Sequence, residues 1–296
     1  MARAGMTQHR NLLMPLNRAC LGKSYPPAVT EVTREAILNY ARACNDDNPR
    51  YFDPAVAGGI VAPPMFAVVA TWIPLLSAMT DPELHADLLR LLHTRQEMEF
   101  LAPIRPGDQI VATATIATIV DTPGGESMTV ELSAANQIGA PVNRTRFTVL
   151  IRGRRVPEAR VSPTDESARG VAPLAVVTQT IDRDQTFRYA EAPGDRNPIH
   201  VDENVAKLAG LPGIIVHGLC TMAFVSRALI EQVCAGDPLR LKRLALNFSR
   251  PVFPGDAITT SIWPAGDTRG LQCFTFATVN AEGLAVIRNG TAEVSP

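Results

Sequence analysis

Residues 189–206 read Tyr-Ala-Glu-Ala-Pro-Gly-Asp-Arg-Asn-Pro-Ile-His-Val-Asp-Glu-Asn-Val-Ala, and this stretch carries the information that decides the fold and the chemistry. After the turn-forming Gly194 come Asp195, Asn197 and His200, so a carboxyl, an amide and an imidazole lie within six residues. A short loop of this kind can direct an acid and a base into one small cavity. Imidazole has an unperturbed pKa of about 6.5, so it can accept or donate a proton near neutral pH.

A related segment lies earlier in the chain, where residues 40–53 read Tyr-Ala-Arg-Ala-Cys-Asn-Asp-Asp-Asn-Pro-Arg-Tyr-Phe-Asp. Its first tyrosine, its Asp-x-Asn-Pro and its last aspartate match those of residues 189–202 at an offset of 149 residues. A second motif, Pro-x-x-Pro-Gly-Asp, occurs at residues 103–108 and again at 251–256, an offset of 148. Two matches at nearly one offset predict a tandem of two copies of one domain.

The chain of 296 residues is long enough for two domains of ordinary size. We expect the first copy to occupy residues 1–153 and the second copy residues 174–296. The stretch between them, residues 154–173, is rich in Pro, Ser, Arg and Glu and has little periodicity, which is typical of a linker.

Each copy is expected to form an α+β domain with the same order of elements. A first helix ends at the Asp-x-Asn-Pro turn, because proline disfavours the helical conformation in the residue before it. An uncharged stretch then predicts a long buried helix, and alternating runs rich in Val and Thr predict an antiparallel meander. A sheet curled round one apolar helix buries the hydrophobic faces of both. The expected helices are 31–44, 54–80, 182–192 and 208–226, and the expected strands are 109–120, 127–136, 142–152, 257–263, 271–279 and 285–294.

The composition argues against several classes of partner. Charged residues make up 19% of the chain and the net charge is -1, which gives no reason to expect nucleic acid or an acidic membrane surface. The five cysteines show no Cys-x-x-Cys spacing, and no secretory signal is evident, so reduced thiols in a cytoplasmic protein are expected. Residues 54–80 are long enough to cross a bilayer. Because Pro63, Pro64 and Pro74 interrupt them, we interpret them as a buried helix.

The second copy also offers a helix N-terminus, where Val216-His217-Gly218-Leu219 leads into an apolar stretch. Backbone N–H groups there are unpaired and the helix dipole favours negative charge, so they can hold an anionic oxygen. Gly218 lets a ligand approach the backbone closely. A helix terminus of this kind beside an acid and a base suits a reaction in which proton transfer accompanies the build-up of negative charge on an oxygen.

Residues 189–206 resemble the signature of the MaoC-like (R)-specific enoyl-CoA hydratase and dehydratase family at nearly every position. The tandem organisation resembles the two-copy form of that family, in which the N-terminal copy is a degenerate dehydratase-like domain. The resemblance implies a double hot-dog fold, in which each of two antiparallel sheets wraps round a long central helix.

The resemblance also implies roles for individual residues. Asp195 and His200 would activate the water, and the N–H of Gly218 would bind the thioester oxygen. Ser226, eight residues beyond the glycine, and Asn197 would support the site.

Several of these residues also have a purely structural interpretation. Asp195 and Asn197 could shape the turn, and Ser226 could be a small packing residue. His217 could pack or hold the loop, so it is left out of the catalytic pair. For His93 the sequence suggests only a surface or interface role.

The first copy lacks the decisive groups. Tyr51 stands where His200 stands, and a phenol with a pKa of about 10 is a poor base at neutral pH. Val61-Ala62-Pro63-Pro64 replaces Val216-His217-Gly218, and proline has no N–H to offer an oxyanion. We therefore expect the first copy to be non-catalytic.

The expected function is that of a lyase, which reversibly hydrates a trans-2-enoyl thioester of coenzyme A to the (R)-3-hydroxyacyl thioester. No metal or redox cofactor is implied, and coenzyme A enters only as part of the substrate. Pairing of two chains into a homodimer is also expected.

Three alternatives stay open at this stage. The protein could be a dehydratase in a fatty-acid, dicarboxylic-acid (mesaconyl-type) or polyketide pathway. It could be a hot-dog thioesterase, which would need a carboxylate on the long helix, whereas residues 219–229 contain none. It could be a non-catalytic acyl-binding protein, but such a protein would have no need of an Asp195–His200 pair.

Overall fold

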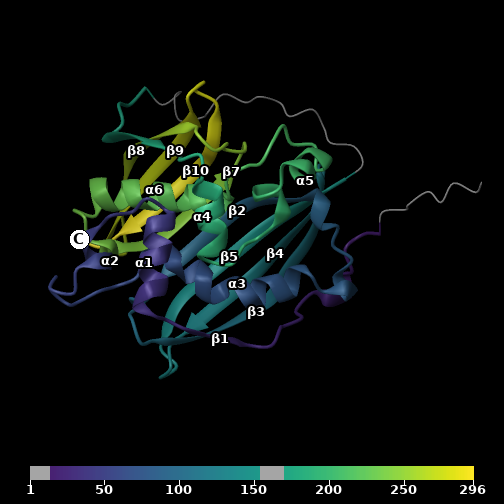
Figure 1. The fold of residues 1–296 in the computed structure, drawn as a ribbon, viewed down its shortest axis with the longest axis horizontal. Coiled ribbons are helices and arrows are strands. Elements are labelled where there is room, and N and C mark those ends of the chain that lie inside the picture. Colours follow the sequence, from purple (N-terminus) through teal and green to yellow (C-terminus); the bar gives the residue numbers. More distant parts are fainter. Residues whose placement is uncertain (1–13, 154–169) are drawn as a thin grey trace, which may run out of the picture.

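An antiparallel sheet runs through both halves of the chain (Figure 1). The structure is a computed structural model, which describes residues 14–153 and 170–296. The sheet has 10 strands in the order β1-β3-β4-β5-β2-β7-β10-β9-β8-β6. Read from its own edge, the second half has the order β6-β8-β9-β10-β7, which repeats the order β1-β3-β4-β5-β2 of the first half. The strands are β1 (Ala28–Glu31), β2 (Leu91–Phe100), β3 (Gln109–Thr122), β4 (Gly125–Ala135), β5 (Pro141–Arg152), β6 (Ala175–Thr180), β7 (Leu241–Phe248), β8 (Ala257–Thr268), β9 (Leu271–Asn280) and β10 (Ala285–Val294).

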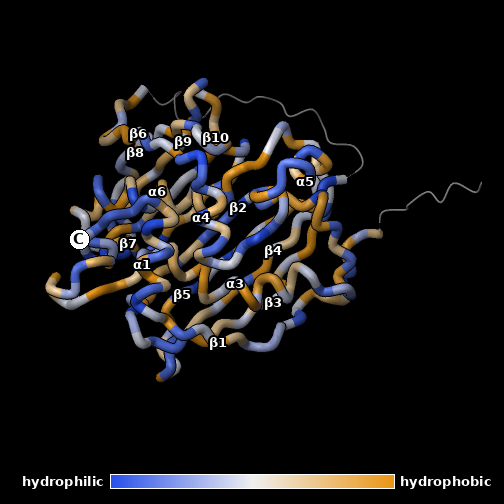
Figure 2. The backbone as a smooth tube through the Cα atoms, viewed as in Figure 1, coloured by the Kyte–Doolittle hydropathy of each residue, from blue (hydrophilic) through white to orange (hydrophobic). Residues whose placement is uncertain are grey.

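One apolar helix packs against the sheet in each half. Helix α3 (Ala67–Met79) contacts β1, β3 and β4, and α6 (Gly218–Val233) contacts β6, β7 and β8. In Figure 2 the segments around α3 and β3 are coloured as hydrophobic. This arrangement confirms the predicted α+β class. Among the described residues, no helix combines the length and the apolar character needed to cross a membrane.

The first apolar helix begins later than the uncharged stretch predicts, whereas the second begins at the His217-Gly218 motif, where the sequence predicts a helix N-terminus. Residues 54–63 form no helix, because Gly58 and Gly59 adopt positive φ angles of 82° and 70° and prolines follow them. Helix α6 begins only at Gly218, so residues 209–217 are loop and turn. It continues beyond the uncharged stretch to Val233, and the charged Arg227 within it pairs with Glu231 at 2.7 Å.

The first helices of the two copies contact each other. Helix α1 (Arg34–Ala43) and helix α4 (Gln185–Glu191) lie within the predicted ranges. Tyr40 and Tyr189, which the repeat matches, are both fully buried, with ring centroids 5.8 Å apart and hydroxyls 3.5 Å apart. Matched residues that meet in this way lie near the axis that relates the two copies. The shorter elements include α2 (Pro49–Phe52), α5 (Glu203–Leu208), η2 (Pro64–Phe66), η4 (Leu88–Arg90), η6 (Pro198–His200) and η7 (Pro238–Arg240).

The two halves of the sheet join at a seam where β2 pairs with β7, from Arg95 opposite Asn247 to Glu99 opposite Arg243. The six predicted strands are all present, and the structure adds β1, β2, β6 and β7. Strand β2 reads Leu-Leu-His-Thr-Arg-Gln-Glu-Met-Glu-Phe, which has no hydrophobic alternation. Its polar side chains bond across the seam, as when Arg243 donates to Glu97 at 2.6 Å. This pairing explains why the sequence pattern does not show the strand.

The predicted linker lies mostly outside the described residues. Of residues 154–173, the structure describes only 170–173. The boundaries of the two domains therefore stay predictions, whereas the repeated strand order is observed.

Candidate functional site

The loop at residues 194–200 is built by local turn chemistry. Gly194 turns the chain after α4 with a positive φ of 80°. The carboxylate of Asp195 accepts a hydrogen bond from the backbone N–H of Asn197 at 3.2 Å. The amide oxygen of Asn197 caps η6 by accepting from the N–H of Ile199 at 3.4 Å, and Pro198 occupies the first position of that turn. These contacts bring His200 to the end of η6, where it is only 7% exposed.

His200 is held as a neutral base. Its Nδ1 lies 2.8 Å from the carbonyl oxygen of Ile215. Because a carbonyl only accepts, Nδ1 carries the proton and Nε2 keeps its lone pair. Burial lowers the pKa of His200 to about 4, so the ring is unprotonated at neutral pH.

Asp195 is partly buried, and its environment favours the neutral acid. Burial raises the pKa of this carboxyl to about 6, against a smaller lowering by the hydrogen bond from Asn197. A carboxyl with such a pKa can exchange protons near neutral pH.

His217 connects the 194–200 loop to the start of α6. Its ring stacks on that of His200 with centroids 3.8 Å apart. Its Nε2 lies 2.9 Å from the carbonyl oxygen of Asp195, and its Nδ1 lies 3.1 Å from the hydroxyl of Thr186. Because the carbonyl of Asp195 only accepts, Nε2 donates to the loop, while the single hydroxyl hydrogen of Thr186 is shared between Nδ1 and the carbonyls of His200 and Ile215. His217 holds the loop, in agreement with the structural interpretation of the sequence.

The carboxyl and the two imidazoles share one space. One oxygen of Asp195 and one nitrogen each from His200 and His217 all lie within 4.8 Å of one another. Such a triplet raises the question of a metal ion. Both ring nitrogens of His217 already have hydrogen-bond partners. His217 would have to lose one of these hydrogen bonds in order to bind a metal ion together with Asp195 and His200. The arrangement suits proton transfer better.

Gly218 is the first residue of α6, so its N–H has no partner within the helix. Because Gly218 directly follows His217, this N–H lies next to the His217 ring in the chain. The loop before it is anchored by the hydrogen bond from Val216 N–H to the carbonyl of Val252 at 2.8 Å. A Cβ at position 218 would lie 3.2 Å from the ring of Phe248. The glycine is therefore needed for the close packing of Phe248 as well as for an exposed amide.

Neither Asn197 nor Ser226 joins the group formed by Asp195, His200 and His217. Asn197 is exposed and acts as a cap, which fits its interpretation as a turn residue. Ser226 is buried in α6, eight residues from Gly218, which is about 12 Å along a helix axis. Their role in catalysis stays a prediction.

Two residues of the site gave no signal in the sequence. Thr186 is fully buried in α4, and its hydroxyl bridges the carbonyl of His200 at 3.0 Å and the ring of His217. Phe248 closes the space beside Gly218. Only the position of Thr186, three residues before the matched tyrosine Tyr189, could have suggested a role.

The corresponding region of the first copy has the same backbone and different chemistry. Ala62 N–H bonds to the carbonyl of Ile104 at 2.8 Å, as Val216 does to Val252, so Pro64 occupies the place of Gly218. Asp46 is buried and its pKa is raised to about 6, like that of Asp195. The hydroxyl of Tyr51, however, is buried without a hydrogen-bond partner among the described residues. The first copy therefore has neither an imidazole at the place of His200 nor an N–H at the place of Gly218, and its lack of activity stays a prediction.

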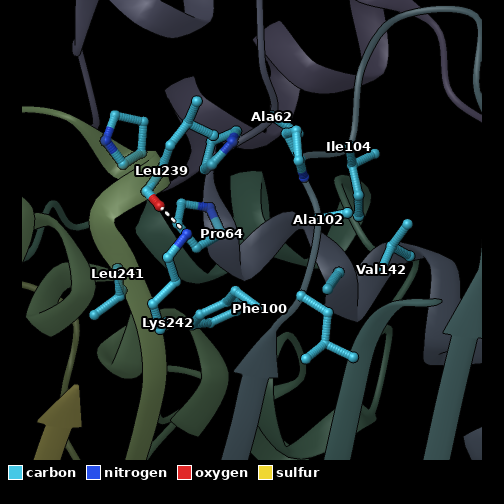
Figure 3. A pocket seen from close by; sticks show the side chains of 14 residues that line it. Ala62, Pro64, Phe100, Ala102, Ile104, Val142, Leu239, Leu241 and Lys242 are labelled. Carbon is cyan, nitrogen blue, oxygen red and sulfur yellow. Dashed lines mark hydrogen bonds between the residues drawn. The ribbon is translucent and has the colours of Figure 1, made fainter. Parts of the chain in front are cut away.

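A pocket of about 170 Å³ lies beside Pro64 (Figure 3). Phe100, Ile104 and Val142 of the first copy line it together with Leu239 and Leu241 of the second. The side chains that line it are apolar except for Lys242, whose amine donates to the carbonyl of Leu239 at 2.7 Å. Such a cavity offers no group for proton transfer.

Two family models match the sequence. The model described as "MaoC like domain" matches residues 165–282. The model described as "FAS1-like, dehydratase domain region" matches residues 19–145. The two matches cover the second and the first copy, respectively.

Three known proteins extend the comparison. A probable enoyl-CoA hydratase 2 of Dictyostelium discoideum is 32% identical over 214 residues, which are 71% of this chain and 72% of that protein. The structure of full-length peroxisomal multifunctional enzyme type 2 from Drosophila melanogaster is 26% identical, with a TM-score of 0.75 over 91% of this chain and 48% of that one. A Mycobacterium tuberculosis protein described as a double hot-dog fold is 12% identical, with a TM-score of 0.61 over 92% of this chain and 95% of that one. The last comparison confirms the predicted double hot-dog fold.

Proposed function

The chain belongs to the MaoC-like hydratase and dehydratase family, and from this premise we propose that it adds water reversibly to a trans-2-enoyl-CoA to give the (R)-3-hydroxyacyl-CoA. The observation that carries the proposal is the meeting of the Asp195 carboxyl and the His200 ring beside the free N-terminus of α6. The chemistry needs no metal and no redox cofactor, because only a proton and a hydroxyl are added.

We infer the following tasks for the three groups. The unprotonated Nε2 of His200 and the carboxyl of Asp195 take a proton from water and return one to C2, while the water oxygen bonds to C3. The electron pair of the double bond moves toward the thioester oxygen, and the N–H of Gly218 stabilises the negative charge that develops there. The same groups in reverse order perform the dehydration.

A thioesterase function is less well supported. The acidic residue of α6, Glu231, lies in the last turn and pairs with Arg227, far from Gly218. A nucleophilic or base-catalysed attack on the carbonyl would need a carboxylate near the start of that helix.

The compartment and the assembly are part of the same proposal. All five cysteines are unpaired thiols, which supports a reducing compartment and the expected cytoplasmic location. The Drosophila relative is named as peroxisomal, so fractionation of cells is the measurement that separates the two compartments. Pairing of two chains is measured by sedimentation equilibrium.

The first prediction concerns the catalytic pair. Asp195→Asn and His200→Gln should each lower kcat by roughly 10²–10⁴-fold, because each removes a group that moves a proton. The measurement is the loss of the enoyl-CoA absorbance on hydration, with free-thiol release followed in parallel. Tyr51→Phe in the first copy is the matched control and should leave most of the activity. Loss of turnover in the control with full activity in His200→Gln would mean that the catalytic copy is the first one, and thiol release without hydration would indicate a thioesterase.

A further inference from the structure

We propose that His93, a residue of the first copy, is a positioning residue for the catalytic site of the second copy. The inference rests on the function proposed above and deepens it. The ring of His93 packs on Phe147 and on Phe248, with centroid distances of 4.0 and 4.6 Å. The ring of Phe248 in turn lies against Gly218, where an added Cβ would be 3.2 Å away. A row of contacts therefore runs from the first copy to the amide that would hold the thioester oxygen.

The repeat shows that this placement belongs to the architecture of the fold. The pairing of β2 with β5 shifts register between residues 93 and 95, and the pairing of β7 with β10 shifts register at the corresponding residues 241–243. A bulge of this kind redirects a side chain. Leu241 lines the apolar pocket of the first copy. His93 occupies the corresponding place at the site of the second copy, so each copy contributes one seam residue to the other.

The hydrogen bonds of His93 suit it to support neighbouring rings. Its Nε2 lies 3.2 Å from the carbonyl oxygen of Arg95 and 3.1 Å from the side-chain oxygen of Gln96, so it donates to the backbone of its own bulge. Burial lowers the pKa of His93 to about 3, so the ring is neutral at neutral pH. The ring is fixed at its edge and leaves its faces free for Phe147 and Phe248.

Removal of the His93 ring is expected to change the position and direction of the Gly218 N–H. Donors of an oxyanion hole act at about 2.7–3.1 Å from the oxygen. Removal of the His93 ring leaves room for Phe248 to move away from Gly218, and a displacement of about 1 Å can cost up to 10²-fold in rate. The first copy, which has no base of its own, would therefore contribute to turnover by holding the start of α6.

The kinetic test compares three variants of the full chain. His93→Ala should lower kcat about 10-fold or more while KM changes less than about threefold, because the loss lies in the transition state. His93→Phe keeps a stacking ring and should restore kcat to within about threefold of wild type. Leu241→Ala is the matched control, because it opens the corresponding contact in the first copy and should lower thermal stability with little change in kcat. Equal kcat in His93→Ala and wild type, failure of His93→Phe to rescue, or an equal loss in Leu241→Ala would each overturn the proposal.

A second readout does not depend on turnover. In protein labelled with ¹⁵N-glycine, the amide resonance of Gly218, which lies beside the Phe248 ring, should shift in His93→Ala and return in His93→Phe. A shift in a protein that hydrates no enoyl-CoA would sink the proposed function and leave the structural coupling in place. An active protein whose Gly218 resonance is unchanged in His93→Ala would sink the coupling and leave the function.

Discussion

At the scale of single residues, burial rather than a partner charge sets the properties of the site. Asp195 and His200 both titrate abnormally because water is removed from around them, and both are driven toward their neutral forms. Asp202, only seven residues from Asp195, provides the contrast. It is exposed and caps α5 by accepting hydrogen bonds from the N–H groups of Asn204 and Val205 at 2.8 and 3.2 Å.

The raised pKa of Asp195 predicts a dependence of stability on pH. The native carboxyl, with a pKa of about 6 against an ordinary 3.8, binds its proton more tightly than the unfolded chain does. The free energy of unfolding therefore falls as the pH rises from about 3.8 to about 6, and the full loss of stability is reached above about pH 6. Asp195→Asn should raise the free energy of unfolding by about 2 kcal/mol at pH 7–8 and by almost nothing near pH 4.

The measurement is urea unfolding at several pH values. Asp267→Asn, in the exposed part of β8, is the control and should change the unfolding free energy by less than about 0.5 kcal/mol. A destabilised Asp195→Asn at pH 8 would show that the ionised carboxyl is stabilised by its surroundings and that the site is well hydrated.

At the scale of elements, the two copies differ at the start of one helix. The backbone hydrogen bond to residue 252 or 104 precedes that start in both copies. In the second copy the helix then begins at Gly218, with a free N–H, whereas in the first copy Pro64 opens a 3₁₀ turn that leads to α3. Proline has no N–H, so Pro64 cannot supply the donor that Gly218 offers, and the regular α-helix starts three residues later.

This difference predicts that a base alone does not restore the first copy. In an Asp195→Asn background, Tyr51→His should give no gain in hydration, because an imidazole beside Asp46 still faces a helix start without an N–H donor. The measurement compares enoyl-CoA hydration in the double variant and in Asp195→Asn alone. A tenfold gain in the double variant would show that the oxyanion donor is dispensable or comes from another group.

At the scale of the whole molecule, the continuous sheet makes the copies one folding unit. Met98 and Leu244 face each other across the seam, and both are fully buried. One hydrophobic cluster includes residues of both halves, among them Tyr40 and Tyr189. A core shared in this way is expected to unfold cooperatively.

Each copy contains one tryptophan, which makes this expectation measurable. Trp72 lies in α3 and Trp263 in β8. Each of the variants Trp72→Phe and Trp263→Phe keeps one tryptophan, which reports on one copy. In each variant the fluorescence transition should occur at the same denaturant concentration as the loss of secondary structure measured by circular dichroism. Separate midpoints for the two probes would mean that the copies unfold independently.

The sequence by itself determined the repeat, the α+β class, the six predicted strands and the position of the loop at residues 194–200, because these depend on local patterns: turn residues at fixed spacing, alternation in strands, and apolar helices. From Tyr51 and Pro64 it also predicted that the first copy is non-catalytic. Only the tertiary structure decided that β2 and β7 join the copies, since their polar residues find partners across a seam that no local pattern reveals. It alone placed Phe248 against Gly218 and His93 against Phe248, because the contact between His93 and Phe248, which belong to different copies, depends on how the two copies pack.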